Sequence, residues 1–311
     1  SWLWRFMRIN PAHRAFIRRL FFSPEEPRLR AGWRLLLQSA LFIFFLIVFQ
    51  YPTLLILNRA HRIASPNALI ASTVISCLAI TASVFVSRRW LDKRPLLSLG
   101  LKLNSQLLVD LGSGIVISGL MIGLIFVIEF LAGWLQIRSF AWEHQSWGRI
   151  GSSLLTMLLI FILIGWQEEL LARGYWLQNL SEGLNQNWGL LLSSAMFSLA
   201  HSANPHVSWE AMLGLFASGI FLAVSWRYSR QLWLPVGLHI GWNFFEGAVF
   251  GFPVSGIVFF QLLRPKVNGP DFVTGGAFGP EAGLILVPAF LLGGGLVYLF
   301  TRRRSDKGDA I

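Results

Sequence analysis

Long apolar runs separated by short polar segments constrain this sequence of 311 residues more than any other feature. Runs of roughly 18 to 25 apolar residues recur along the chain, and a helix of that length crosses the hydrocarbon core of a bilayer. Over the whole chain 54% of the residues are hydrophobic and 13% are charged, with a mean hydropathy of +0.58. Because a helix satisfies its own backbone hydrogen bonds in lipid, the sequence predicts an all-α fold, a polytopic bundle of transmembrane helices.

The apolar runs predict about eight spans within one membrane-embedded domain over residues 32–301. The expected spans lie near residues 33–57, 67–87, 107–136, 151–181, 187–203, 208–226, 232–252 and 282–301. A basic segment, residues 1–31, precedes this domain, and a basic tail, residues 302–311, follows it. Asn10-Pro11 can begin an amphipathic helix in the first segment, which would then lie in the membrane interface. A plain charged tail is an equally good interpretation of that segment.

The net charge of +11 is distributed as the orientation of a membrane protein requires. Eight spans with a cytoplasmic N-terminus place 20 of the 26 Lys and Arg residues on the cytoplasmic side. Both termini are therefore expected inside under the positive-inside rule. We expect the charge to serve contact with the lipid bilayer, and we expect no nucleic-acid partner.

The single cysteine and the two longest connecting segments say less about function than the apolar spans do. Cys77 is the single cysteine, which excludes a disulfide within the chain and a cysteine metal cluster. Residues 88–106 form a basic connector whose charge can hold it at lipid headgroups. Residues 253–281 are rich in Gly and Pro and end at Glu281. That segment can serve as a lid over a site, and ordinary surface packing explains it equally well.

Three short polar motifs interrupt the apolar spans. Ionisable side chains are costly inside a membrane, so their presence there indicates function. The motifs are Glu168-Glu169-x-x-x-Arg173, Phe197-x-x-x-His201 and His239-x-x-x-Asn243.

Helical rise places these motifs in one layer of the membrane. A turn near residues 181–187 puts Glu168 and His201 at the same depth, roughly 20 Å from that turn. If the span near 232–252 starts on the same face, Asn243 lies at roughly 17 Å and His239 at roughly 11 Å. We therefore expect the three motifs to form one site.

Such a site has the groups that peptide hydrolysis needs. A carboxylate and an imidazole can share a water molecule, with the carboxylate taking its proton as general base. A second imidazole and an amide can donate hydrogen bonds to an oxyanion. Glu169 lies four residues before Arg173 on the same helix, so we interpret these two residues as a buried ion pair that stabilises the fold.

The three motifs, in this order and on separate spans, resemble those of the CAAX prenyl protease and bacteriocin-processing family, also called Abi. The phrases Leu232-Trp-Leu-Pro-Val-Gly-Leu-His239 and Trp242-Asn243-Phe are similar to those of its bacterial members. The resemblance is strongest over residues 151–250, and we take residues 151–252 as the motif core. It implies an eight-helix intramembrane peptidase, and its bacterial members suggest a bacterial plasma membrane.

The resemblance also implies roles for individual residues. Glu168 and His201 would activate water, and His239 and Asn243 would form the oxyanion site. The substrate would be a membrane-associated peptide or protein. Although the family is commonly labelled as metalloproteases and Glu168 with two histidines can in principle bind zinc, no His-Glu-x-x-His helix is present, and we expect no cofactor.

Other interpretations remain open for the chain and for several residues. One alternative is a non-proteolytic scaffold, a subunit of a larger membrane complex, in which the same residues serve only packing. A proton-coupled transporter is a weaker alternative, since no internal repeat supports it. Glu246 shares a helix face with His239 and would support the site or only pack, and Glu129 is similarly ambiguous.

Overall fold

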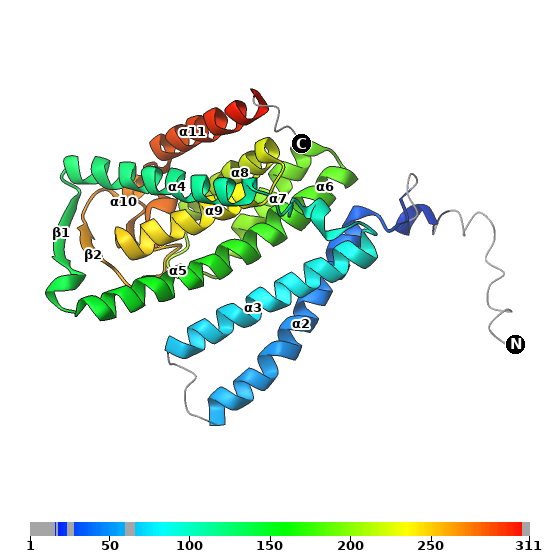
Figure 1. Ribbon diagram of the computed structural model, residues 1–311, viewed down its shortest axis with the longest axis horizontal. Coiled ribbons are helices and arrows are strands. Elements are labelled where there is room, and N and C mark those ends of the chain that lie inside the picture. The colour runs from blue at the N-terminus through cyan, green and yellow to red at the C-terminus, as the bar shows by residue number, and fades with distance from the viewer. Residues whose placement is uncertain (1–15, 17, 24–27, 60–65, 307–311) are drawn as a thin grey trace, which may run out of the picture.

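The computed structural model describes the chain except for residues 1–15, 17, 24–27, 60–65 and 307–311, and the side chains of 53–59, 66–68 and 304–306 are also left out of the description. Most of the described chain is helical, and the helices form a single bundle (Figure 1). The expected helix start at Asn10-Pro11 and the end of the basic tail lie outside the described residues.

The first two helices form a hairpin. Helix α2 covers Ala31–Arg59 and α3 covers Pro66–Val86. A π-helical turn, η2 (Ser87–Leu91), continues α3, and a 3-10 turn, η3 (Leu96–Leu99), follows. The connected end of this hairpin extends away from the other helices (Figure 1).

The remaining helices carry the three motifs, and α9 packs against α4, α5 and α8. Several are apolar throughout, as expected of helices surrounded by lipid and protein. Their bounds are α4 Gln106–Leu131, α5 Trp147–Glu169, η5 Leu170–Trp176, α6 Leu177–Gly183, α7 Gln186–Ala200, α8 Trp209–Ser229, α9 Trp233–Asn243, η6 Phe244–Val249 and α11 Leu286–Asp306.

The predicted all-α membrane bundle is confirmed. Five helical segments of the described chain are long and apolar enough to cross a membrane: Ala31–Pro52, Leu69–Leu91, Gln106–Leu131, Trp147–Gly183 and Trp209–Ser229. The other three expected spans correspond to α7 with 15 residues, to α9 with 11 residues followed by η6, and to α11 with 21 residues. The total of eight spans remains a prediction.

A two-stranded sheet lies at one end of the bundle, where the sequence predicted only helix and loops (Figure 1). Strand β1 (Leu135–Phe140) pairs antiparallel with β2 (Leu263–Val267). The expected third span therefore ends at Leu131 rather than near residue 136. The pairing joins segments far apart in sequence, so local hydrophobic periodicity could not reveal it.

The segment after β2 folds back over the bundle. It forms a short helix and two 3-10 turns: α10 (Asp271–Thr274), η7 (Gly276–Phe278) and η8 (Pro280–Ala282). The backbone of η8 packs directly on α8, because a Cβ atom at Gly214 would overlap the carbonyl oxygen of Glu281. The Gly-rich segment thus holds a fixed position against the helix.

Helices α4 and α9 cross in direct backbone contact. A Cβ atom at Gly114 would lie 2.5 Å from the backbone nitrogen of Leu238, and one at Gly237 would overlap the carbonyl oxygen of Leu111. Small residues allow such close approach between membrane helices. This crossing fixes the position of α9, the helix that carries His239 and Asn243.

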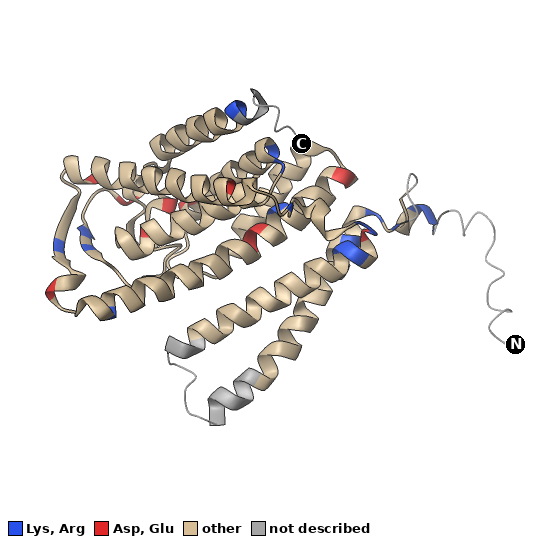
Figure 2. Cartoon of the chain, viewed as in Figure 1, with Lys and Arg blue, Asp and Glu red and all other residues tan. Residues whose placement is uncertain are grey.

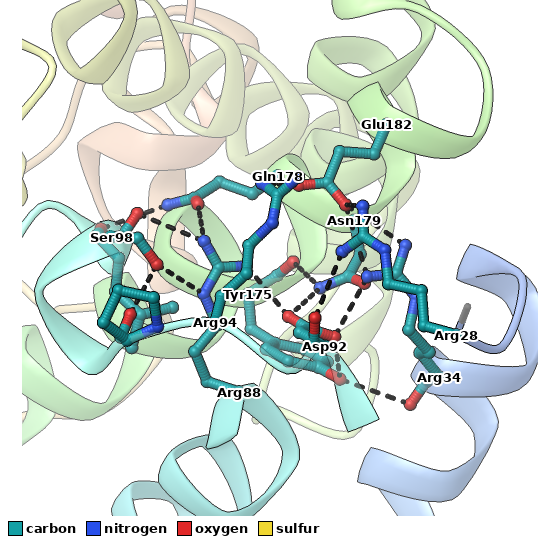
Figure 3. A network of polar contacts seen from close by, with 12 residues as sticks. Arg28, Arg34, Arg88, Asp92, Arg94, Ser98, Tyr175, Gln178, Asn179 and Glu182 are labelled. Carbon is teal, nitrogen blue, oxygen red and sulfur yellow. Dashed lines mark hydrogen bonds and ion pairs between the residues drawn. The ribbon is translucent and has the colours of Figure 1, made fainter. Parts of the chain in front are cut away.

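Lys and Arg residues lie mainly towards the two ends of the bundle, whereas several Asp and Glu residues lie along its helices (Figure 2). At the end opposite the sheet, Asp92 is fully buried and its carboxylate accepts hydrogen bonds from Arg34 (3.1 Å), Arg88 (2.8 Å), Tyr175 (3.3 Å) and Asn179 (3.3 Å) (Figure 3).

A second carboxylate, that of Glu182, joins the same network. It pairs with Arg28 (3.1 Å), Arg34 (3.2 Å) and Arg94 (2.5 Å) (Figure 3). The interpretation of residues 88–106 as a headgroup contact is therefore incomplete. Part of that basic connector is buried in ion pairs that hold the α2–α3 hairpin against α6, because a buried arginine needs a carboxylate partner.

Candidate active site

The Glu168-Glu169 pair lies where α5 changes its helical pitch. Helix α5 ends at Glu169 and continues without a break as the π-helical segment η5. Such π segments are frequent at functional sites, because the inserted residue alters the direction of nearby side chains. The side chain of Glu168 is 24% exposed, whereas Glu169 is fully buried. Adjacent carboxylates thus have different surroundings.

His201 lies directly after the last residue of α7 and bonds back to that helix. Its Nδ1 lies 2.9 Å from the carbonyl oxygen of Phe197, one of the last carbonyls of α7. A carbonyl oxygen only accepts hydrogen bonds, so Nδ1 carries the proton. In the neutral ring Nε2 is then unprotonated, and it lies 3.5 Å from Oε2 of Glu168.

His239 approaches the same carboxylate from α9. Its Nε2 lies 3.8 Å from Oε2 of Glu168, and its Nδ1 lies 2.8 Å from Oε1 of Glu169. Oε1 of Glu169 also accepts a hydrogen bond of 2.7 Å from Arg173. Glu169 therefore orients a histidine as well as pairing with the arginine, which the sequence did not indicate.

Phe197 packs among these residues. The guanidinium carbon of Arg173 lies 4.5 Å from the centre of its ring, a cation–π contact. The ring centre lies 4.8 Å from that of His201 and 6.1 Å from that of His239. Phe197 is 5% exposed, and its ring packs against both imidazoles.

Polar residues from each of the three motifs line one cavity of about 450 Å³. Its wall includes Glu168, His201, His239 and Asn243, and Asn243 is 5% exposed. A cavity of this size is typical of small-ligand and substrate sites, which range over roughly 300 to 1,000 Å³. Most of the remaining wall is apolar, and α2 and α3 contribute to it.

The other two acidic residues considered in the sequence lie away from the wall. Glu246 is fully buried in η6, and both of its carboxylate oxygens have no hydrogen-bond partner among the described residues. Glu129 is buried in the same way in α4. Neither residue is among those that line the cavity.

Two wall residues that the motif analysis missed come from the Gly-rich segment. Ser255 and Glu281 both line the cavity, and Oε2 of Glu281 accepts hydrogen bonds from the backbone nitrogen (2.7 Å) and Oγ (2.5 Å) of Ser255. The pKa of Glu281 is raised above its usual value by burial, and the hydrogen bonds from Ser255 offset only part of this rise. The signal in the sequence was a carboxylate that ends a long Gly-rich loop, but its position against α8 depends on tertiary contacts.

The acidic and histidine side chains of the cavity are the residue types that can bind a metal ion. Zinc sites use three or more His, Cys, Asp or Glu ligands in a compact group. In the described part of the chain no group of three or more such side chains is arranged to hold a metal. Independence from metal remains a prediction.

Comparison with known proteins connects this site to one family. A family model described as type II CAAX prenyl endopeptidase Rce1-like matches residues 150–245, which contain all three motifs. Comparisons with curated proteins and with solved structures give no significant match. Over residues 150–245 the chain is therefore similar to type II CAAX prenyl endopeptidases.

Proposed function

We propose that this protein is an intramembrane endopeptidase that hydrolyses a peptide bond of a membrane-associated protein or peptide. The observation that supports this most directly is the convergence of two imidazole Nε2 atoms on the carboxylate of Glu168, at 3.5 and 3.8 Å, in one cavity. General-base catalysis needs such a carboxylate within reach of a bound water.

Glu168 and His201 activate the water in this proposal. Glu168 takes one proton as general base while the unprotonated Nε2 of His201 accepts a hydrogen bond from the other. The hydrogen bond from Nδ1 of His201 to Phe197 supports this role, because it holds the ring in the required tautomer. The water oxygen then forms a bond to the scissile carbonyl carbon.

His239 and Asn243 stabilise the oxyanion that forms on the carbonyl oxygen. Nε2 of His239 would donate one hydrogen bond to this oxyanion, and the contact of 2.8 Å between Nδ1 and the carboxylate of Glu169 orients the ring. The Asn243 side chain supplies a second donor from the same wall. The oxyanion then reverts to a carbonyl as the peptide C–N bond breaks, and Glu168 gives its proton to the leaving nitrogen, so the carboxylate is restored.

The principal test uses the purified full chain and a broad library of membrane-soluble peptides. Glu168→Gln keeps the shape of the side chain but removes its basicity, so turnover should fall by at least about a hundredfold. The melting temperature in detergent should stay close to that of the parent. Glu143→Gln is the matched control, because Glu143 is exposed and outside the cavity. Undiminished turnover in folded Glu168→Gln would overturn the assignment.

The same experiment separates this function from a scaffold in a larger membrane complex. A scaffold would cleave no peptide, and Glu168→Gln would not change its assembly into the complex. Comparing the proteomes of host membranes that contain the parent or Glu168→Gln then identifies substrates, because uncleaved proteins should accumulate only with the variant.

A further inference from the structure

Glu281 lines the cavity, but it belongs to none of the three motifs and has no role in the proposed reaction. It is 6% exposed and lines the same wall as the catalytic candidates. It also lies outside residues 150–245, the segment matched by the family model. Its contribution therefore belongs to the part of the site built by the Gly-rich segment.

The carboxylate of Glu281 is held on one side only. Both hydrogen bonds from Ser255 end on Oε2, and no described residue donates a hydrogen bond to Oε1. Ser255 is in turn linked to the loop after His201, because the side-chain amide of Asn204 donates to the Ser255 carbonyl at 3.2 Å. This chain of contacts fixes the carboxylate close enough to His201 and His239 for electrostatic interaction.

The only basic side chains among the described residues of the cavity wall are the imidazoles of His201 and His239. Two carboxylates, those of Glu168 and Glu281, are among the described residues of the wall, and no lysine or arginine is. Arg173 is buried but is already bound to Glu169 and to the carbonyl oxygen of Gly219. A carboxylate held in an apolar wall gains much from a cationic ligand, because a buried charge without a counter-ion is costly.

We infer that Glu281 is a specificity residue that binds a cationic group of the substrate, an ammonium or guanidinium, close to the scissile bond. This inference rests on the proposed peptidase function and adds a substrate class to it. The cation can be a Lys or Arg side chain or the free amino group of the peptide. An acidic side chain at the same place is disfavoured, because both wall carboxylates repel it.

A structural role for Glu281 makes a different prediction. If the carboxylate only fastened the turn at Ser255, a glutamine would also accept its hydrogen bonds, since its carbonyl oxygen occupies the same place. Glu281→Gln therefore retains the acceptor and removes the charge. A preference that depends on substrate charge should then disappear without loss of the fold.

The test measures peptide binding first. The full-length Glu168→Gln protein in detergent is titrated with fluorescent peptides, blocked at both ends, that carry lysine, acetyl-lysine or norleucine at successive positions. At one position lysine should bind at least about tenfold more tightly than acetyl-lysine, as expected for a charge-assisted hydrogen bond. Adding Glu281→Gln should reduce this ratio to near one, whereas adding Glu143→Gln should leave it unchanged.

A second peptide series distinguishes the two sources of the cation. These peptides have no lysine or arginine and carry either a free or an acetylated amino terminus. A preference for the free amine that is lost in Glu281→Gln assigns the subsite to the amino group of the peptide. Equal binding of charged and neutral peptides in both series would overturn the inference, and this result needs no variant at Glu281.

Cleavage by the parent protein separates this inference from the proposed function. Peptides that bind with the expected charge preference but are never cleaved would contradict the peptidase and support the cation subsite. Peptides that are cleaved with equal kcat/KM whatever their charge would support the peptidase and reject the subsite.

Discussion

His239 and Arg173 share a single oxygen of Glu169. Nδ1 of His239 lies 2.8 Å from Oε1 of that carboxylate, and the Arg173 guanidinium donates to the same atom at 2.7 Å. All three side chains are at least nine-tenths buried. The orientation of His239 and the stability of the packing between α5 and α9 therefore depend on the same carboxylate, that of Glu169.

Replacing Arg173 should destabilise the protein. In Arg173→Ala the buried carboxylate of Glu169 loses its cation, which typically costs about 3 to 5 kcal/mol. The substitution also removes the hydrogen bond to Gly219 and the contact with Phe197. Thermal unfolding in detergent should show a clearly lower melting temperature. Exposed Arg149→Ala is the control, and an equal small shift in both variants would contradict the buried pair.

Removing both charges should separate stability from catalysis. Glu169→Gln with Arg173→Met leaves no unpaired buried charge, so we expect a higher melting temperature than for Arg173→Ala alone. Turnover should remain at least about tenfold below that of the parent, because His239 has lost the carboxylate that contacts its Nδ1 and orients its ring. Recovery of both quantities would show that Glu169 does not act through His239.

Hydrolysis should survive chelation of metal ions. The proposed water is activated by Glu168 and His201, and no step needs a Lewis acid. Activity of the purified protein is measured with and without a zinc chelator, followed by addition of zinc. Activity that is lost with chelator and restored by zinc would replace the proposed mechanism with a metal-dependent one.

The orientation of the chain is tested by reporter fusions. With both termini in the cytoplasm and eight spans, fusions after residues 60, 145 and 270 should all report the external side, because 20 of 26 basic residues then lie inside. A cytoplasmic signal at any of these positions would show that the predicted number of spans before it is wrong.

The sequence alone determined the fold class and the positions of the motifs along the chain. Hydropathy sets the class because lipid requires each span to satisfy its own backbone hydrogen bonds. Helical rise then places Glu168 and His201 at the same depth, because regular helices convert sequence distance into depth.

Contacts between distant segments were decided only by the tertiary structure. The β1–β2 pair, the buried ion pairs of Asp92 and the bond between Glu169 and His239 join residues far apart in sequence. Glu281 enters the cavity because η8 packs against Gly214 and Ser255 holds its carboxylate. Local periodicity predicts helices and the faces they present, but it carries no information on which side chains meet across the bundle, since that depends on how all the helices pack together.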